Sequence, residues 1–125
     1  MIYGIGIDMV KNVRIEQAVE RWGKRFLERV YTEREIAYAY RKNDPYLSLS
    51  VRFAAKEAFI KAFSPGQPIP FTDIEVRNQD TGKPLMEIRG RTGELLKQRS
   101  IQKIQVSLSH EKDYSVACVV IEGEL

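Results

Sequence analysis

The sequence contains one cysteine, one histidine and no long hydrophobic run. A single cysteine cannot form a disulfide within the chain, which excludes a small secreted disulfide scaffold. One histidine and one cysteine cannot complete an ordinary zinc site. No apolar segment approaches the roughly 18 residues of a membrane-spanning helix, and the first residues lack the basic lead and apolar stretch of a signal peptide. These absences predict a cytoplasmic protein with no membrane partner.

The fractions of hydrophobic and charged residues are ordinary, but the charged residues are unevenly distributed along the chain. The 125 residues are 43% hydrophobic and 30% charged, which predicts one soluble domain over residues 1–125. The net charge is only +3. Residues 1–64, however, carry 12 Lys and Arg against 8 Asp and Glu, whereas residues 65–125 carry 8 against 9. The positive excess lies in the first half, which favours an acidic partner.

The spacing of hydrophobic residues changes between that of strands and that of helices. The expected strands cover residues 2–10, 71–78, 85–89, 103–109 and 114–121, and the expected helices cover residues 12–22, 25–30, 32–41, 47–63 and 92–99. Asn12 is expected to cap the first helix, Thr32 and Glu35 to form a capping box at the third, and Pro45 to lie in the first turn of the longest. The longest helix is apolar around most of its circumference, which is typical of a buried helix. We therefore expect an α+β fold with a mostly antiparallel sheet around it.

Asp8 follows the apolar part of the first strand, where a carboxylate has no packing role. Two interpretations stay open. The residue either caps or turns the chain before the helix, or it binds a metal ion or a phosphate group. In the second case Gly4 and Gly6 would allow the backbone or a ligand to approach closely.

Glu57 and Lys61 are four residues apart and share one face of the long helix. Such spacing usually marks an exposed ion pair. The surrounding alanines and phenylalanines, however, are expected to leave little of this turn for solvent, so both charges would need partners. Mg²⁺ and a phosphate could supply them, because Mg²⁺ prefers oxygen ligands and few carboxylates. Arg52 and Lys56 are expected to add cations on a neighbouring face.

Three further features have both a structural and a functional interpretation. His110 ends a strand before a tight turn, so it is either a turn residue or a ligand contact. Arg14 and Arg21 lie about 20° apart around a helix, with Arg25 as an extension, and form either a solvated face or a binding stripe for carboxylates or phosphates. Cys118 lies in an apolar strand and is expected to be a buried small residue, not a nucleophile.

The pieces in combination resemble one enzyme family. They are GIGIDMV at residues 4–10, RFAAKEAF at 52–59, FTDIEV at 71–76, GKP at 82–84 and SLSHE at 107–111. In this order and spacing they resemble the holo-acyl-carrier-protein synthases, which are small 4′-phosphopantetheinyl transferases. The resemblance covers about residues 2–121 and implies the fold of that family. The combination is specific, whereas no single motif is.

The resemblance implies an activity. The 4′-phosphopantetheine group of coenzyme A would pass to a serine of apo-acyl carrier protein, releasing adenosine 3′,5′-bisphosphate and supporting fatty acid biosynthesis. Asp8 and Glu57 would hold Mg²⁺, and Lys61 would neutralise charge on the leaving group. Glu57 is the candidate acceptor of the serine proton, with Asp8 or a water molecule as alternatives.

The resemblance also implies binding residues and an assembly. The implied coenzyme A contacts are Arg52, Lys61, Gly82, Lys83, Pro84, Ser109 and His110. The acidic carrier protein would dock on Arg14, Arg21 and Arg25. Family members of this size form homotrimers with active sites at the subunit interfaces, and the same is expected here.

One segment departs from the family pattern, and two other functions compete. After Lys61 many members have a Gly-Thr-Gly turn, whereas this chain has a proline-rich loop over residues 64–70. The first alternative is a small basic α+β module that binds nucleic acid, although no strand has the basic and aromatic pattern of an RNA-binding sheet. The second is a coenzyme A binder without catalysis. The transferase interpretation, with no nucleic-acid partner, explains Asp8 and Glu57 best.

Overall fold

The computed structural model describes residues 1–124. In chain order the elements are β1 (Ile2–Lys11), α1 (Asn12–Trp22), α2 (Lys24–Val30), α3 (Glu33–Ala39), α4 (Pro45–Phe63), a 3₁₀ turn (Phe71–Asp73), β2 (Ile74–Asn78), β3 (Pro84–Ile88), α5 (Gly90–Gln98), β4 (Ile101–His110) and β5 (Tyr114–Gly123).

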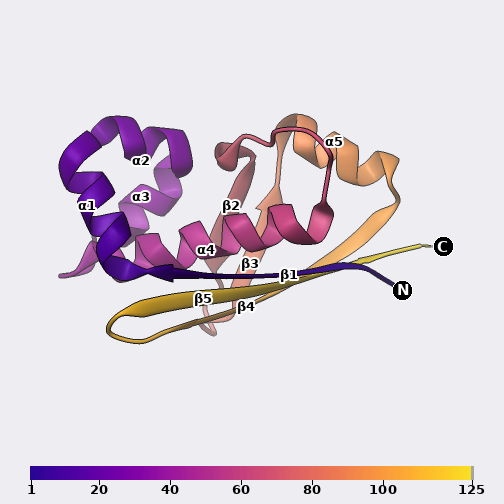
Figure 1. Cartoon of the computed structure of the whole chain (residues 1–125). Coiled ribbons are helices and arrows are strands. Elements are labelled where there is room, and N and C mark those ends of the chain that lie inside the picture. Colours follow the sequence, from indigo (N-terminus) through magenta and orange to yellow (C-terminus); the bar gives the residue numbers. More distant parts are fainter. Residues whose placement is uncertain (125) are drawn as a thin grey trace.

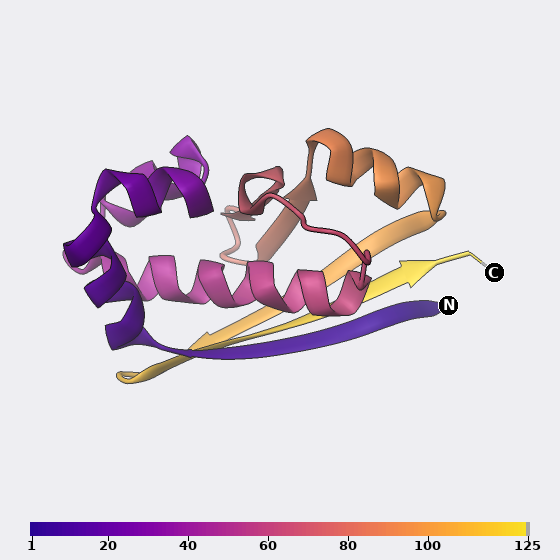
Figure 2. The ribbon, with the colours of Figure 1, turned by 45° about the horizontal axis from the view of Figure 1, so that its top comes forward.

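The strands form two antiparallel groups. β1, β5 and β4 make a three-stranded sheet in that order, and β2 and β3 make a two-stranded one. α4 runs along the three-stranded sheet, with α1, α2 and α3 gathered at one end of the molecule and α5 near the other (Figure 1). Figure 2 shows the helices on the same side of that sheet. The expected α+β class and antiparallel pairing are confirmed.

The long helix lies at the centre of the core, as its composition predicts. Ala54, Ala58 and Phe59 of α4 are fully buried, and they belong to the same apolar cluster as Ile74 of β2 and Val119 of β5. A second cluster joins α1, α2 and α3 to the first half of α4 and contains Ile15, Val30, Tyr31, Ala39 and Leu49. The arm formed by α1, α2 and α3 is therefore packed onto the helix that carries Glu57.

Two glycines bring β1 against α4. A Cβ atom added to Gly4 would overlap the carbonyl oxygen of Ala62, and one added to Gly6 would overlap that of Ala58. Side chains at these positions would push the strand away from the helix. The close backbone approach considered for Gly4 and Gly6 is thus present, and it places Asp8 of β1 beside the last turns of α4.

Several local expectations are wrong. Asn12 does not cap α1, because Lys11 takes the cap position and the Asn12 side chain bonds to a distant turn. Asp8 lies inside β1 and not at its end, since the strand continues to Lys11. Cys118 is only half-buried. Tertiary contacts that a local pattern does not contain decide each case.

Two expected helix signals are confirmed. Thr32 caps α3 through a capping box, in which its hydroxyl accepts from the amide of Glu35 and the Glu35 carboxylate accepts from the amide of Thr32. Pro45 lies in the first turn of α4, which begins two residues before the expected start.

Candidate active site

Asp8, Glu57 and Lys61 meet where β1 crosses the second half of α4. The Lys61 ammonium donates to Oδ1 of Asp8 at 3.0 Å and to the backbone carbonyl of Ile7 at 3.0 Å. The Asp8 side chain is only 16% exposed, whereas the Lys61 side chain is 53% exposed. The expectation that this turn is shielded from solvent is therefore wrong for Lys61. Its exposure leaves the ammonium able to move between Asp8 and a ligand.

The Glu57 carboxylate shares this location. Burial is the main cause that raises its pKa above the usual glutamate value, and the negative charge of Asp8 raises it further, while Lys61 acts in the opposite direction. Two neighbouring carboxylates repel each other, and with a single lysine beside them the site is short of positive charge. A cation between them would relieve that repulsion.

Lys56 lies outside this site, contrary to expectation. Its side chain is fully buried and its ammonium donates to the Glu35 carboxylate at 2.7 Å and to the carbonyl oxygens of Val30, Phe71 and Ile74. Burial lowers the pKa of Lys56, and the charge of Glu35 opposes this. All the donors of this ammonium have partners within the chain, so Lys56 joins α2, α3 and β2 to α4 and is not available to a ligand.

A second site lies on the other side of α4. A pocket of about 470 Å³ is lined by four of the residues expected to contact coenzyme A, namely Arg52, Gly82, Pro84 and His110. Tyr38 and Asn78 also line it, although no sequence motif pointed to either residue. The pocket collects residues from α3, α4, the turn between β2 and β3, and the end of β4.

The Arg52 guanidinium forms the floor of this pocket and is held in place. It donates to the hydroxyl of Ser48 at 2.9 Å and to the side-chain carbonyl of Asn78 at 2.6 Å, and it stacks on the ring of Tyr38 at 4.6 Å. The residue is 3% exposed, and within residues 1–124 its Nε has no hydrogen-bond partner. Burial lowers the pKa of Arg52.

Two expected coenzyme A contacts lie elsewhere in this chain. Ser109 and His110 are consecutive in β4, so their side chains point to opposite faces of the sheet, and only His110 lines the pocket. Lys83 lines a different hollow, between β3 and β4. The structure thus gathers part of the expected set around one pocket and leaves Ser109 and Lys83 outside it.

The two sites face away from each other. Arg52 and Lys61 are nine residues apart on α4, which places them about 180° apart around the helix axis. Glu57 is about 140° from Arg52 by the same measure. The carboxylate site and the Arg52 pocket of one chain therefore lie on different faces of α4.

The basic stripe on the arm is exposed as expected. Arg14 and Arg21 of α1 and Arg25 of α2 are all exposed. Arg21 stacks on the ring of the half-exposed Trp22 at 5.0 Å. α1 is fixed from the other side by Ile15, which is 4% exposed. The basic stripe is therefore an exposed row of cations that runs from the anchored helix α1 onto α2.

The outer face of the three-stranded sheet is apolar along β1 and β5, whereas β4 adds Gln105, Ser107 and Ser109 to it. In the part of the chain that the structure describes, no helix covers this face (Figure 2). Ile5, Ile7 and Met9 of β1 are each more than 60% exposed. They pair with Val120, Cys118 and Val116 of β5, which point to the same face. Within residues 1–124, no helix is long and apolar enough to cross a membrane.

Comparisons with known proteins agree with this geometry. The sequence profile of the 4′-phosphopantetheinyl transferase superfamily matches residues 4–119. The chain is 47% identical over 123 residues to the holo-[acyl-carrier-protein] synthase of Halothermothrix orenii, with 98% of each chain covered.

Solved structures give the same result. The holo-[acyl-carrier-protein] synthase of Neisseria meningitidis superimposes with a TM-score of 0.88 at 34% identity, covering 98% of this chain and 99% of that one. The enzyme of Bacillus anthracis, whose structure is a complex with coenzyme A (3′,5′-ADP), superimposes with a TM-score of 0.82 at 37% identity, covering 99% of both chains. This chain belongs to the 4′-phosphopantetheinyl transferase superfamily.

Proposed function

We propose that this chain is a holo-acyl-carrier-protein synthase. It transfers the 4′-phosphopantetheine group of coenzyme A to a serine hydroxyl of apo-acyl carrier protein and releases adenosine 3′,5′-bisphosphate, in support of fatty acid biosynthesis in the cytoplasm. The observation that carries the proposal is the meeting of Asp8, Glu57 and Lys61 where β1 crosses α4. Relatives of this name align over nearly the whole chain.

The donor set fits Mg²⁺. Within residues 1–124 no cluster of three or more His, Cys, Asp or Glu side chains could hold a metal by itself. Asp8 and Glu57 are a pair, and a pair suits Mg²⁺ because this ion commonly takes one or two carboxylates and completes its octahedron with phosphates and water. The bound ion would stabilise negative charge on the pyrophosphate of coenzyme A.

The side chains around the pair then divide the work. Lys61 exchanges Asp8 for a phosphate oxygen and neutralises charge on the leaving group, for which its exposed ammonium is placed. Glu57 is the proposed acceptor of the serine proton, because it is the partly buried carboxylate beside Asp8 and Lys61. Phosphoryl transfer needs positioning and charge stabilisation more than covalent chemistry, so this small set suffices.

The Arg52 pocket is the proposed site for the rest of coenzyme A. Arg52, Gly82, Pro84 and His110 line it. The two nitrogen-bearing side chains, Arg52 and His110, can contact phosphate, and the apolar wall suits an adenine ring. Ser109, on the opposite face of β4, and Lys83, in the hollow between β3 and β4, belong to the proposal as contacts outside this pocket.

The basic stripe is the proposed docking surface for the carrier protein. Arg14, Arg21 and Arg25 present guanidinium groups to solvent. Guanidinium groups bind carboxylates in a bidentate manner and steer an acidic partner toward the site.

We propose that three copies of the chain assemble, with each active site shared between two copies. The apolar outer face of the sheet supports an assembly, because exposed apolar patches of this kind mark protein interfaces. The opposite directions of the two sites on α4 support sharing. The Arg52 pocket of one copy would complete the Asp8 and Glu57 site of its neighbour.

The function is tested with coenzyme A, Mg²⁺ and apo-acyl carrier protein, followed by intact mass. We expect the carrier serine to gain the phosphopantetheine mass. Glu57→Gln and Asp8→Asn should each lower the rate by at least about 100-fold, whereas Glu94→Gln, an exposed carboxylate on α5, should not. No mass gain with the native chain, while a control enzyme works, would contradict the proposal. Binding of random DNA or RNA in its place would favour the nucleic-acid module.

A further inference from the structure

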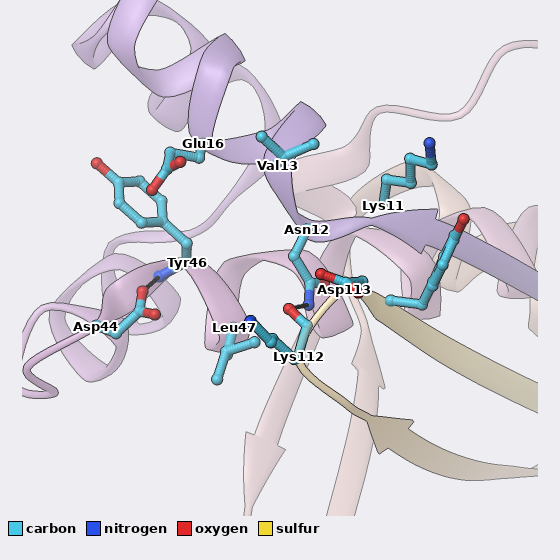
Figure 3. A pocket seen from close by; sticks show the side chains of 10 residues that line it. Lys11, Asn12, Val13, Glu16, Asp44, Tyr46, Leu47, Lys112 and Asp113 are labelled. Carbon is cyan, nitrogen blue, oxygen red and sulfur yellow. Dashed lines mark hydrogen bonds between the residues drawn. The ribbon is translucent and has the colours of Figure 1, made fainter.

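Asn12 is a buried side chain that no motif explains. It is 7% exposed and follows the last residue of β1. Its amide nitrogen donates to the carbonyl oxygens of Glu111 at 3.0 Å and Lys112 at 3.1 Å, and its amide oxygen accepts from the hydroxyl of Ser115 at 2.7 Å. Its backbone amide donates to the carbonyl of Asp113 at 2.9 Å. Three of these bonds reach the turn between β4 and β5, and the fourth reaches the start of β5. Figure 3 shows Asn12 beside Lys112 and Asp113 of that turn.

The turn has little else to hold it. Glu111, Lys112 and Asp113 are exposed, and one backbone bond, from the amide of Glu111 to the carbonyl of Tyr114, closes the turn. Exposed turns with few buried contacts open more readily than the strands that they connect. The Asn12 amide, which has two donor hydrogens, satisfies two successive carbonyls of this turn at once.

The clamped turn directly follows His110. His110 is the last residue of β4, pairs with Ser115 across the hairpin and lines the Arg52 pocket. Within residues 1–124, β4 is an edge strand, and its end pairs with no strand other than β5. A turn that moves will carry the imidazole of His110 with it. The position of His110 therefore depends on a residue about 100 positions earlier in the chain.

The same residue stands at a junction of three functional parts. It is four residues after Asp8 and two before Arg14 in the sequence. Its side chain fixes the hairpin end that carries His110 to the point where β1 becomes α1. The Asn12 amide therefore links the end of β1, which carries Asp8, and the start of α1, which carries Arg14, to the hairpin turn next to His110.

We propose that Asn12 is a positioning residue for coenzyme A, which acts by clamping the 111–113 turn and thereby holding His110 at the Arg52 pocket. The inference rests on the proposed function, because it takes His110 to contact coenzyme A. Asn12 does not touch the substrate. Its loss should weaken coenzyme A binding and leave both the chemical step and carrier docking in place.

The test compares four variants as the intact protein: Asn12→Ala, Asn12→Asp, His110→Ala and the Asn12→Ala/His110→Ala double variant. Asn12→Asp keeps the acceptor for Ser115 but sets a carboxylate against two carbonyl oxygens. Gln17→Ala, on an exposed position of α1, is the matched control. Dissociation constants for adenosine 3′,5′-bisphosphate are measured by calorimetry, together with kcat and the KM of each substrate.

We expect Asn12→Ala and Asn12→Asp to weaken binding of adenosine 3′,5′-bisphosphate about tenfold, the effect of losing about one hydrogen bond between His110 and the ligand. The KM of coenzyme A should rise with it, while kcat and the KM of the carrier change less than about twofold. Amides of residues 109–115 should exchange hydrogen faster. The double variant should bind no more weakly than His110→Ala, since both changes act through one imidazole.

Three results would overturn the inference: additive losses in the double variant, equal rises in both KM values, or unchanged hydrogen exchange in the turn. Failure of the proposed function has a different signature. If His110→Ala binds the bisphosphate as well as the native chain does, or if the native chain does not bind it, the coenzyme A site itself has been assigned wrongly.

Discussion

The Glu57 carboxylate lies where partial burial and the charge of Asp8 both disfavour ionisation, so its pKa is raised. Asp8→Asn removes the second cause and leaves the first. We therefore expect the pKa of Glu57 to fall in this variant and to remain above the usual glutamate value. An NMR titration of the side-chain carboxyl groups in the metal-free protein measures this. Asp80→Asn, in an exposed turn, is the control and should leave the pKa of Glu57 unchanged. An unchanged pKa of Glu57 in Asp8→Asn would show that the charge of Asp8 does not act on Glu57.

Lys56 shows how a charge next to a catalytic candidate can belong to the core. Replacing it by Met leaves the buried Glu35 carboxylate without its cation, and breaking such a pair costs about 3–5 kcal/mol. We expect Lys56→Met to lower the free energy of unfolding by about this amount in urea denaturation. The double change Glu35→Leu/Lys56→Met should recover part of the loss, because no unpaired charge then remains buried. Lys97→Met, an exposed residue on α5, is the control, and an equal loss there would contradict the explanation.

Among the elements, α1 has the most direct prediction. The helix is held by Ile15 on one side and exposes Arg14 and Arg21 on the other. Reversing these charges repels an acidic carrier. We expect Arg14→Glu and Arg21→Glu each to raise the KM of the carrier about tenfold or more, and that of coenzyme A less than about twofold.

The effect should shrink at high salt, because charges that meet at an exposed surface are screened. Lys97→Glu changes the charge of α5 by the same amount, away from the arm, and should leave both KM values in place. If Arg14→Glu and Arg21→Glu changed the KM of the carrier and that of coenzyme A equally, this would contradict the proposed docking of the carrier on α1.

Elements also show what a local pattern can predict. α4 was expected to be buried because apolar residues occupy most of its circumference, and it is buried. The capping box of α3 was expected because both of its partners lie within four residues. Asn12 was misassigned because its hydrogen-bond partners lie about 100 residues further along the chain. Interactions between residues of one element can be predicted from the sequence, and interactions between residues of distant elements cannot.

For the whole molecule, an active site shared between two subunits can be distinguished from one within a single chain by mixing two inactive variants. Asp8→Asn damages the carboxylate site, and Arg52→Ala/His110→Ala damages the pocket. When the two variants are co-expressed, or mixed so that their subunits exchange, we expect them to regain part of the native rate at low coenzyme A. Some interfaces then combine the intact pocket of one variant with the intact carboxylate site of the other. Each variant alone should stay slow. No recovery in mixtures that have formed mixed oligomers would place the whole site within one chain.

The proposed assembly would bury the apolar residues of β1 and β5. Ile7→Glu puts a carboxylate in the middle of the apolar row on β1, where burial of an unpaired charge is costly. Sedimentation should show trimers for the native chain and monomers for this variant. The single domain over residues 1–125 stays a prediction.

By itself the sequence determined the residue types and their order along the chain: the fold class, the long buried helix, the family motifs, and Asp8, Glu57 and Lys61 as candidates for one site. It could do so because strand and helix periodicity and short motif spacings are local properties. The tertiary structure decided which of those charges face a ligand. It buried Lys56, exposed Lys61, set Asp8 beside α4 through two glycines, and turned Asn12 to a distant hairpin, because burial and hydrogen bonding depend on neighbours that the chain supplies only when it folds.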